Sequence, residues 1–316
     1  MAHEIRTFLA FIVLGAIALG CGQNAHRIPC LAPPSANASA AQASATAPDA
    51  GIRRPRPEPC PDVTLEQIRA QWTSFTWSAP ESDVTEPSGI LMQRVTDARY
   101  EIVHRVRVPD AFRWCEVYNA VLAFGQPDGI AIRVIPEERA ERAFLSIGAA
   151  YDLESNTFEI TNSFRYIVRS IMEMRLVHEA THAVIHWEFL RQLRGHGIDF
   201  QQFRTRCQQQ AYTYRFVSEA LAYLNGARWL YRRGYTPEFS AMDPIRADYP
   251  TENNALRSAA GDSEAIRRFA EVMQLNGGFG LPLDRTTWTS CTLPLDLRFG
   301  MADFLDPLLR VPLANP

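Results

Sequence analysis

The chain of 316 residues contains no lysine, so its 32 basic residues are all arginine. A lysine Schiff base and a P-loop of the usual kind both need the lysine amine, so the sequence excludes both. An excess of positive charge is also missing, because the formal net charge is −3 at pH 7. The sequence therefore does not favour a nucleic-acid-binding protein.

Cysteine pairs with metal-ligand spacing are absent as well. The six cysteines form no CxxC motif, which argues against a zinc site built from cysteine. Five remain apart from Cys21, and an odd number leaves at least one free or paired outside the chain: Cys30, Cys60, Cys115, Cys207 and Cys291. An exported protein can form disulfides, but the sequence leaves their pairing open.

The apolar run at residues 9–19 is too short to cross a bilayer as a stable helix, and no later run is long enough. It follows Arg6 and is typical of the core of a signal peptide. The run ends in IALGC at residues 17–21, which resembles the lipobox of bacterial lipoproteins. This resemblance implies a signal peptide over 1–20, a lipid on Cys21, and an exported chain anchored to a bacterial membrane on its periplasmic or cell-surface side. An ordinary cleaved signal peptide is the alternative.

Residues 21–61 are predicted to form a disordered linker, because the segment after residue 31 is mostly alanine, serine, proline and threonine. Such a segment is suited to tether a domain to a membrane. The remaining residues, 62–316, suit one domain with two lobes, which we place at about 62–195 and 196–316.

The expected elements of this domain mix helices and strands, which predicts an α+β fold. Alternating apolar residues predict strands at 99–108 and 129–136 and a β-hairpin at 149–161 with its turn at 154–156. Helices are expected at 64–72, 110–124, 163–193 and 207–233, with two shorter ones within 252–275. The tail from 277 shows little regular period.

The long helical run at 163–193 contains two histidines one turn apart, His178 and His182, within an apolar stripe. Their rings can converge on one metal ion, whereas two unpaired imidazoles on a buried face would each cost about 1–3 kcal/mol. Glu179 is rotated by about 100° from His178, so it is placed to contact a metal-bound water rather than the metal.

The sequence from His178 to His182, HEATH, matches the HExxH motif in full and resembles the active-site helix of zincin metallopeptidases. The resemblance covers about residues 129–231. It implies a zincin-like fold, in which a small sheet packs its edge strand on the active-site helix and a mainly helical C-terminal lobe follows. It also implies one Zn²⁺ per chain and Glu179 as general base.

A catalytic zinc usually takes a third protein ligand, and the best candidate is Glu219. It lies in an apolar helix stripe, where a carboxylate is rarely buried without a partner. A glutamate on a later helix resembles the gluzincin branch of the zincins, although Tyr223 stands where many gluzincins have an acidic residue. Pairing of Glu219 with Arg215 is the alternative, and other third ligands considered are Glu188, His186 and His196.

The predicted function is zinc-dependent hydrolysis of peptide bonds in a peptide or protein substrate that adds a strand to the edge near 149–161. Candidate donors to the oxyanion stay open among Tyr214, Tyr223, Tyr231 and His196. Alternatives are a non-catalytic zinc-binding or scaffold lipoprotein, a metal-free helix with core histidines, and hydrolysis of a cell-wall amide. The sequence does not predict the oligomeric state.

Overall fold

The computed structural model describes residues 70, 75–79, 84–105, 107–108, 110–142, 149–234 and 287–309. All of them belong to one compact unit, Pro55–Pro316. The signal peptide, Cys21, the linker, the helices predicted within 252–275 and, except for Ala70, the helix predicted at 64–72 lie outside the described residues. Among the described helices, none combines the length and the hydropathy that a membrane span requires.

The described residues form a mixed α+β fold with seven α-helices and one three-stranded sheet. The helices are α2 (Gly89–His104), α3 (Trp114–Ala123), α4 (Glu137–Arg142), α5 (Arg169–Gly195), α6 (Phe200–Arg206), α7 (Gln208–Arg232) and α12 (Ala302–Leu309). The strands are β1 (Ala131–Val134), β2 (Ala149–Asp152) and β3 (Thr157–Ile160), and a short 3₁₀ helix, η1 (Asn162–Tyr166), precedes α5.

The sheet has the order β1-β3-β2, with β3 parallel to β1 and antiparallel to β2. The strand predicted at 129–136 and the hairpin at 149–161 are therefore confirmed. All four residues of β3 are buried, as expected for a central strand. A bridge from Thr85 extends pairing beyond β1, whereas β2 has no strand on its outer side among the described residues. Within the described part of the chain, β2 is therefore an edge strand of the sheet.

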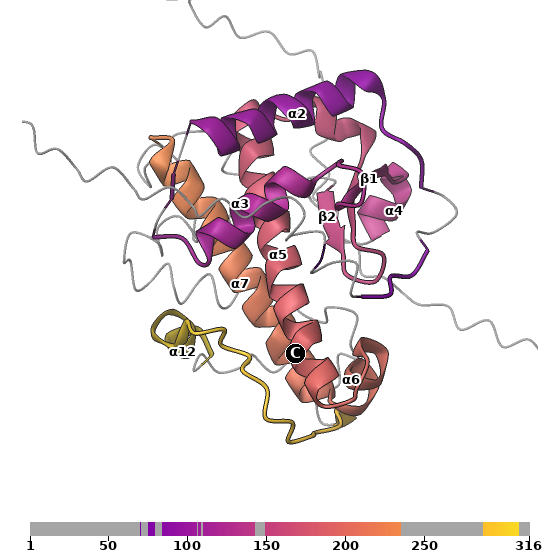
Figure 1. The fold of residues 1–316 in the computed structure, drawn as a ribbon, viewed down its shortest axis with the longest axis vertical. Helices are drawn as coiled ribbons and strands as arrows, with labels where there is room; N and C mark the ends of the chain where they lie inside the picture. Colours follow the sequence, from indigo (N-terminus) through magenta and orange to yellow (C-terminus); the bar gives the residue numbers. More distant parts are fainter. Residues whose placement is uncertain are drawn as a thin grey trace, which may run out of the picture. The chain divides into compact units, whose positions relative to one another are not determined.

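Helix α5 is the central element of the fold, and it packs against α2, α3, α7 and β2 (Figure 1). Most of its side chains are buried, so the helix is covered on most sides. It begins at Arg169 rather than near 163, because the β-branched residues Ile167 and Val168 are extended. The predicted helices at 110–124 and 207–233 are confirmed as α3 and α7.

The strand predicted at 99–108 is wrong, because residues 89–104 form helix α2. Its buried stripe contains Leu91, Val95 and Ala98, spaced as in a helix. Glu101 continues that stripe and is only 5% exposed. This charged residue on the buried face interrupts the apolar pattern, so the sequence does not show the helical period.

Two buried carboxylates lie where α2, α5 and α7 meet. Glu173 is fully buried and forms ion pairs with Arg169 (3.4 Å) and Arg233 (3.2 Å). Arg169 also pairs with Glu101 of α2 at 3.1 Å. Burial raises the pKa of Glu173, and the two arginines oppose that rise. These ion pairs link three helices at one end of α5.

The segment 287–309 is joined to α7 by a disulfide between Cys207 and Cys291. Cys115 is disulfide-bonded as well. The segment contains helix α12, which the sequence did not predict; Leu305 and Leu308, about one helical turn apart, are fully buried. The disulfide fixes this segment to the beginning of the helix that contains Glu219.

The two long helices α5 and α7 approach closely at Gly226. A Cβ atom on Gly226 would lie 3.1 Å from both Cγ and Sδ of Met174 in α5. The next residue toward the N-terminus, Asn225, is fully buried and accepts a hydrogen bond from Phe112 N–H (2.8 Å). Its amide donates to Phe112 O and to Thr181 Oγ1, both at 3.0 Å. Thr181 belongs to the HEATH motif, so one amide fixes α7 to the motif-bearing helix.

Replacing Asn225 with alanine should destabilise the protein by about 3 kcal/mol, because buried polar groups of Phe112 and Thr181 lose their partner. Urea unfolding followed by circular dichroism measures this change. The exposed pair of Gln93 and Asp97 supplies the control, since Gln93→Ala should change the stability by less than about 0.5 kcal/mol. Equal effects of the two substitutions would contradict the role assigned to Asn225.

Candidate metal centre

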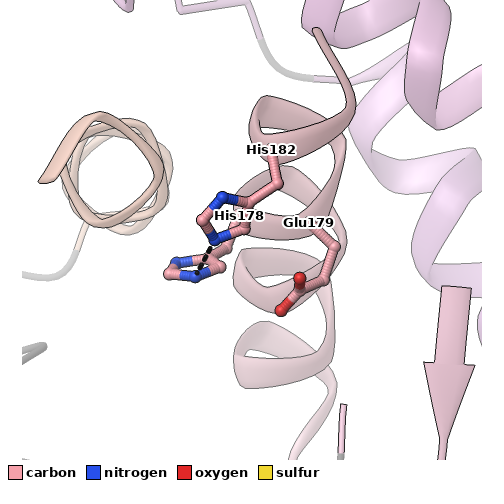
Figure 2. A group of neighbouring side chains, drawn as sticks. All are labelled: His178, Glu179 and His182. Carbon is pink, nitrogen blue, oxygen red and sulfur yellow. Dashed lines mark hydrogen bonds between the residues drawn. The ribbon is translucent and has the colours of Figure 1, made fainter. Parts of the chain in front are cut away.

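The two histidines of the motif face each other on α5. His178 and His182 are 3% and 8% exposed, and their Nε2 atoms lie 3.1 Å apart (Figure 2). The spacing of four residues places the rings on successive turns of one helix face. Two buried ring nitrogens at this distance need either a shared proton or a cation between them.

Glu219 of α7 brings a carboxylate to the same point. Its Oε2 lies 3.5 Å from Nε2 of His178 and 3.4 Å from Nε2 of His182. The three atoms thus form a triangle with sides of 3.1, 3.4 and 3.5 Å. Ligands of a tetrahedral zinc at its usual bond lengths are separated by about 3.3 Å. The donor atoms and their spacing therefore fit a zinc ion.

The Glu219 side chain is 26% exposed, whereas the two histidines are nearly inaccessible. Of the three side chains, that of Glu219 is therefore the most accessible to solvent. Among the ion pairs of the described residues, Glu219 contacts the histidines and not Arg215. The pairing with Arg215 that the sequence allowed does not form.

Ser218 orients the second histidine. Its Oγ lies 2.8 Å from Nδ1 of His182, on the side of the ring opposite to Glu219. With the proton on Nδ1, the ring donates to Ser218 and presents an unprotonated Nε2, which is the form that binds metals. Two neighbouring residues of α7 therefore contact both nitrogens of one imidazole.

His178 has a different environment. Its Nδ1 is buried and forms no hydrogen bond within the described part of the chain. Its ring packs edge-to-face against Tyr223, with the ring centroids 4.5 Å apart. Tyr223 occupies the position where many gluzincins have an acidic residue, and here it contacts the histidine through an aromatic ring.

Glu179 projects from α5 close to the two histidines (Figure 2). Its Oε2 accepts a hydrogen bond of 2.8 Å from the main-chain N–H of Tyr151 in β2. One of its carboxylate oxygens still lies within 4.8 Å of the ring nitrogens. Glu179 is therefore close enough to act on a molecule bound at the histidines, while Glu219 is the carboxylate that faces both Nε2 atoms.

Burial dominates the electrostatics of the centre. It lowers the pKa of His178 to about 3 and raises the pKa of Glu179 to about 7. Burial also opposes the charges of His182 and Glu219, but these two groups stabilise each other. As a result the pKa of His182 is raised and that of Glu219 is well below its usual value. In the metal-free protein, His182 and Glu219 therefore favour each other's charged forms, whereas burial disfavours the charge of His178.

The other third-ligand candidates lie away from this point. Glu188 pairs with Arg113 and Arg191. His186 is buried and its Nδ1 lies 2.8 Å from the Tyr214 hydroxyl, so it is a core histidine.

His196 is an exposed residue at the end of α5, about 21 Å along the helix axis from His182. Of the tyrosines considered as oxyanion donors, Tyr214 is buried against His186 and Tyr231 is 55% exposed. Only Tyr223 contacts one of the two motif histidines.

Comparisons with protein-family models, with curated proteins and with solved structures find no match for this chain. The assignment of a candidate metal centre therefore rests on the geometry of these residues. Sequence reasoning did not identify two of its residues, Ser218 and Tyr151. Serine next to a candidate ligand carries no distinctive signal, and Tyr151 contributes through its main chain, which no residue type reveals.

Replacing Glu219 with glutamine should lower the pKa of His182 in the metal-free protein. The carboxylate that stabilises the imidazolium is lost, while the burial that destabilises it remains. NMR titration of the imidazole resonances in the presence of a chelator measures the change. The exposed carboxylate of Glu154 supplies the control, because Glu154→Gln should leave this pKa unchanged. An unaltered His182 pKa in Glu219→Gln would show that the two side chains are not paired.

Proposed function

We propose that the chain is a zinc-dependent metallopeptidase of the zincin type, with His178, His182 and Glu219 as zinc ligands. The observation that carries this proposal is the convergence of three donor atoms from two helices, at 3.1–3.5 Å from one another. Three protein ligands with access for one further ligand are typical of catalytic zinc, whereas structural zinc usually has four. The partial exposure of the Glu219 side chain is compatible with the catalytic arrangement.

The surrounding elements support the zincin comparison. The sheet is small, and its edge strand β2 packs against α5, which contains the HEATH motif. The third candidate ligand follows on α7, as in the gluzincin branch. An extended peptide that adds to the outer side of β2 would lie next to Glu179, because β2 already contacts that residue through Tyr151.

A bound zinc ion would lower the pKa of a water molecule toward 7 and polarise the scissile carbonyl. Glu179 would accept the proton of the attacking water and donate it to the leaving amine. Ser218 would hold the ring of His182, and Tyr223 would pack against His178. Of the four oxyanion donors considered, Tyr223 is the one whose position favours that role.

Elemental analysis of the purified chain should find about one zinc per chain. The His178→Ala and Glu219→Ala variants should each lose it, because each removes one of three ligands. Glu188 lies on the same helix as the histidines, and its carboxylate pairs with Arg113 and Arg191. The Glu188→Ala variant should therefore retain the metal. Absence of zinc from the wild-type chain after reconstitution, or its retention in Glu219→Ala, would contradict the proposed ligand set.

Glu179→Gln should keep the zinc and lower the hydrolysis of peptides by about 10²–10⁴-fold, the usual contribution of a general base. A pool of quenched fluorescent peptides provides the assay, and Glu154→Gln provides a control at an exposed site. Equal activity of Glu179→Gln and the wild type would argue against its role. A zinc-loaded wild type without hydrolysis would favour the alternative of a non-catalytic zinc-binding or scaffold protein.

A further inference from the structure

The hydrogen bond between strand β2 and Glu179 uses an unusual donor. Tyr151 lies opposite Phe158 in the β2–β3 ladder, yet its N–H bonds to Glu179 rather than to β3. In an antiparallel pair, alternate residues direct their N–H and C=O groups away from the partner strand. The N–H of Tyr151 therefore points away from β3, to the outer side of β2.

The same donor is one that a peptide strand would need. β2 contains only four residues, and only Ala149 and Tyr151 direct main-chain groups outward, since they alternate with Ala150 and Asp152. A peptide that pairs with this edge gains its affinity from main-chain hydrogen bonds. It would have to bond to the Tyr151 N–H or leave a large part of the edge unpaired. The Glu179 carboxylate and a peptide carbonyl would thus compete for the same donor, the Tyr151 N–H.

The Glu179 carboxylate has few alternative hydrogen-bond partners. Its side chain is only 3% exposed, enclosed between α5 and β2, so its accessible partners are few. The bond to Tyr151 occupies Oε2 of a carboxylate that lies within 4.8 Å of the histidine ring nitrogens. Loss of this bond would free Oε2 to accept a proton from a water molecule bound at the histidines.

We propose that the main-chain N–H of Tyr151 is shared between Glu179 and the substrate, so that pairing of an extended peptide with β2 releases Glu179 for catalysis. This inference rests on the proposed peptidase function. It makes β2 a specificity-determining element, because a short amide cannot pair with the edge and leaves Glu179 bound to Tyr151. The preferred substrate class is then an extended peptide segment, and isolated amides are poor substrates.

The first test compares Tyr151→Pro, which lacks the N–H, with Tyr151→Ala, which keeps it but lacks the ring. Proline is tolerated where the N–H of an edge strand faces outward. The probes are a fluorogenic blocked single-residue amide and a quenched ten-residue peptide, assayed with the zinc-loaded full-length chain. Zinc content is measured for each variant.

Tyr151→Pro should raise kcat for the short amide by about tenfold, because Glu179 is no longer held, and raise KM for the long peptide by a similar factor. Tyr151→Ala should keep the wild-type ratio of the two rates. If Tyr151→Pro lowers kcat for both probes in the same proportion, the N–H only positions Glu179, and the proposal is overturned.

A second measurement needs neither activity nor a folded proline variant. Selective ¹⁵N-tyrosine labelling of the zinc-free full-length chain gives at most 10 amide signals, and the Tyr151 signal is identified by its absence in Tyr151→Phe. It should move upfield in Glu179→Ala, and in the wild type when the ten-residue peptide is added, but not with the short amide. No movement in either case overturns the inference, while zinc content and the Glu179→Gln assay separately test the proposed function.

Discussion

The close packing of α7 against α5 is the contact on which the candidate site depends. Gly226 permits the approach, because even a Cβ atom there would lie 3.1 Å from the Met174 side chain, a tighter contact than most. Asn225 of α7 stabilises this helix contact through hydrogen bonds to Phe112 and to Thr181 of α5. Glu219 lies about two turns earlier on the same rigid helix. The position of its carboxylate relative to the histidines therefore follows from helix packing at a point remote from the carboxylate itself.

Two adjacent residues of α7 contact the two ring nitrogens of His182. Ser218 holds Nδ1 and Glu219 faces Nε2, so the ring is restrained from both sides. His178 is held differently, by packing against Tyr223, and its Nδ1 lacks a hydrogen bond among the described residues. The two histidines thus differ in how strongly their orientation is determined, although they belong to one motif and one helix face.

Local periodicity could be predicted from the sequence, and contacts between distant segments could not. The spacing of His178 and His182 is a property of one helix, and the apolar stripe around Glu219 indicated a carboxylate that needs a partner. The approach of Ser218 to His182 depends on how two helices pack, which no spacing encodes. Helix α2 was missed because the buried Glu101 interrupts its apolar pattern, and its partner Arg169 is distant in sequence.

The disulfide between Cys207 and Cys291 has a topological consequence. It encloses all of α7 and the chain that follows it in one covalent ring, with a sequence separation of 84 residues. A single backbone cut inside that ring opens it without producing two separate fragments. The piece that carries His178 and the piece that ends at residue 316 would stay joined. A cut between residues 207 and 219 would therefore leave both histidines and Glu219 on one molecule until the disulfide is reduced.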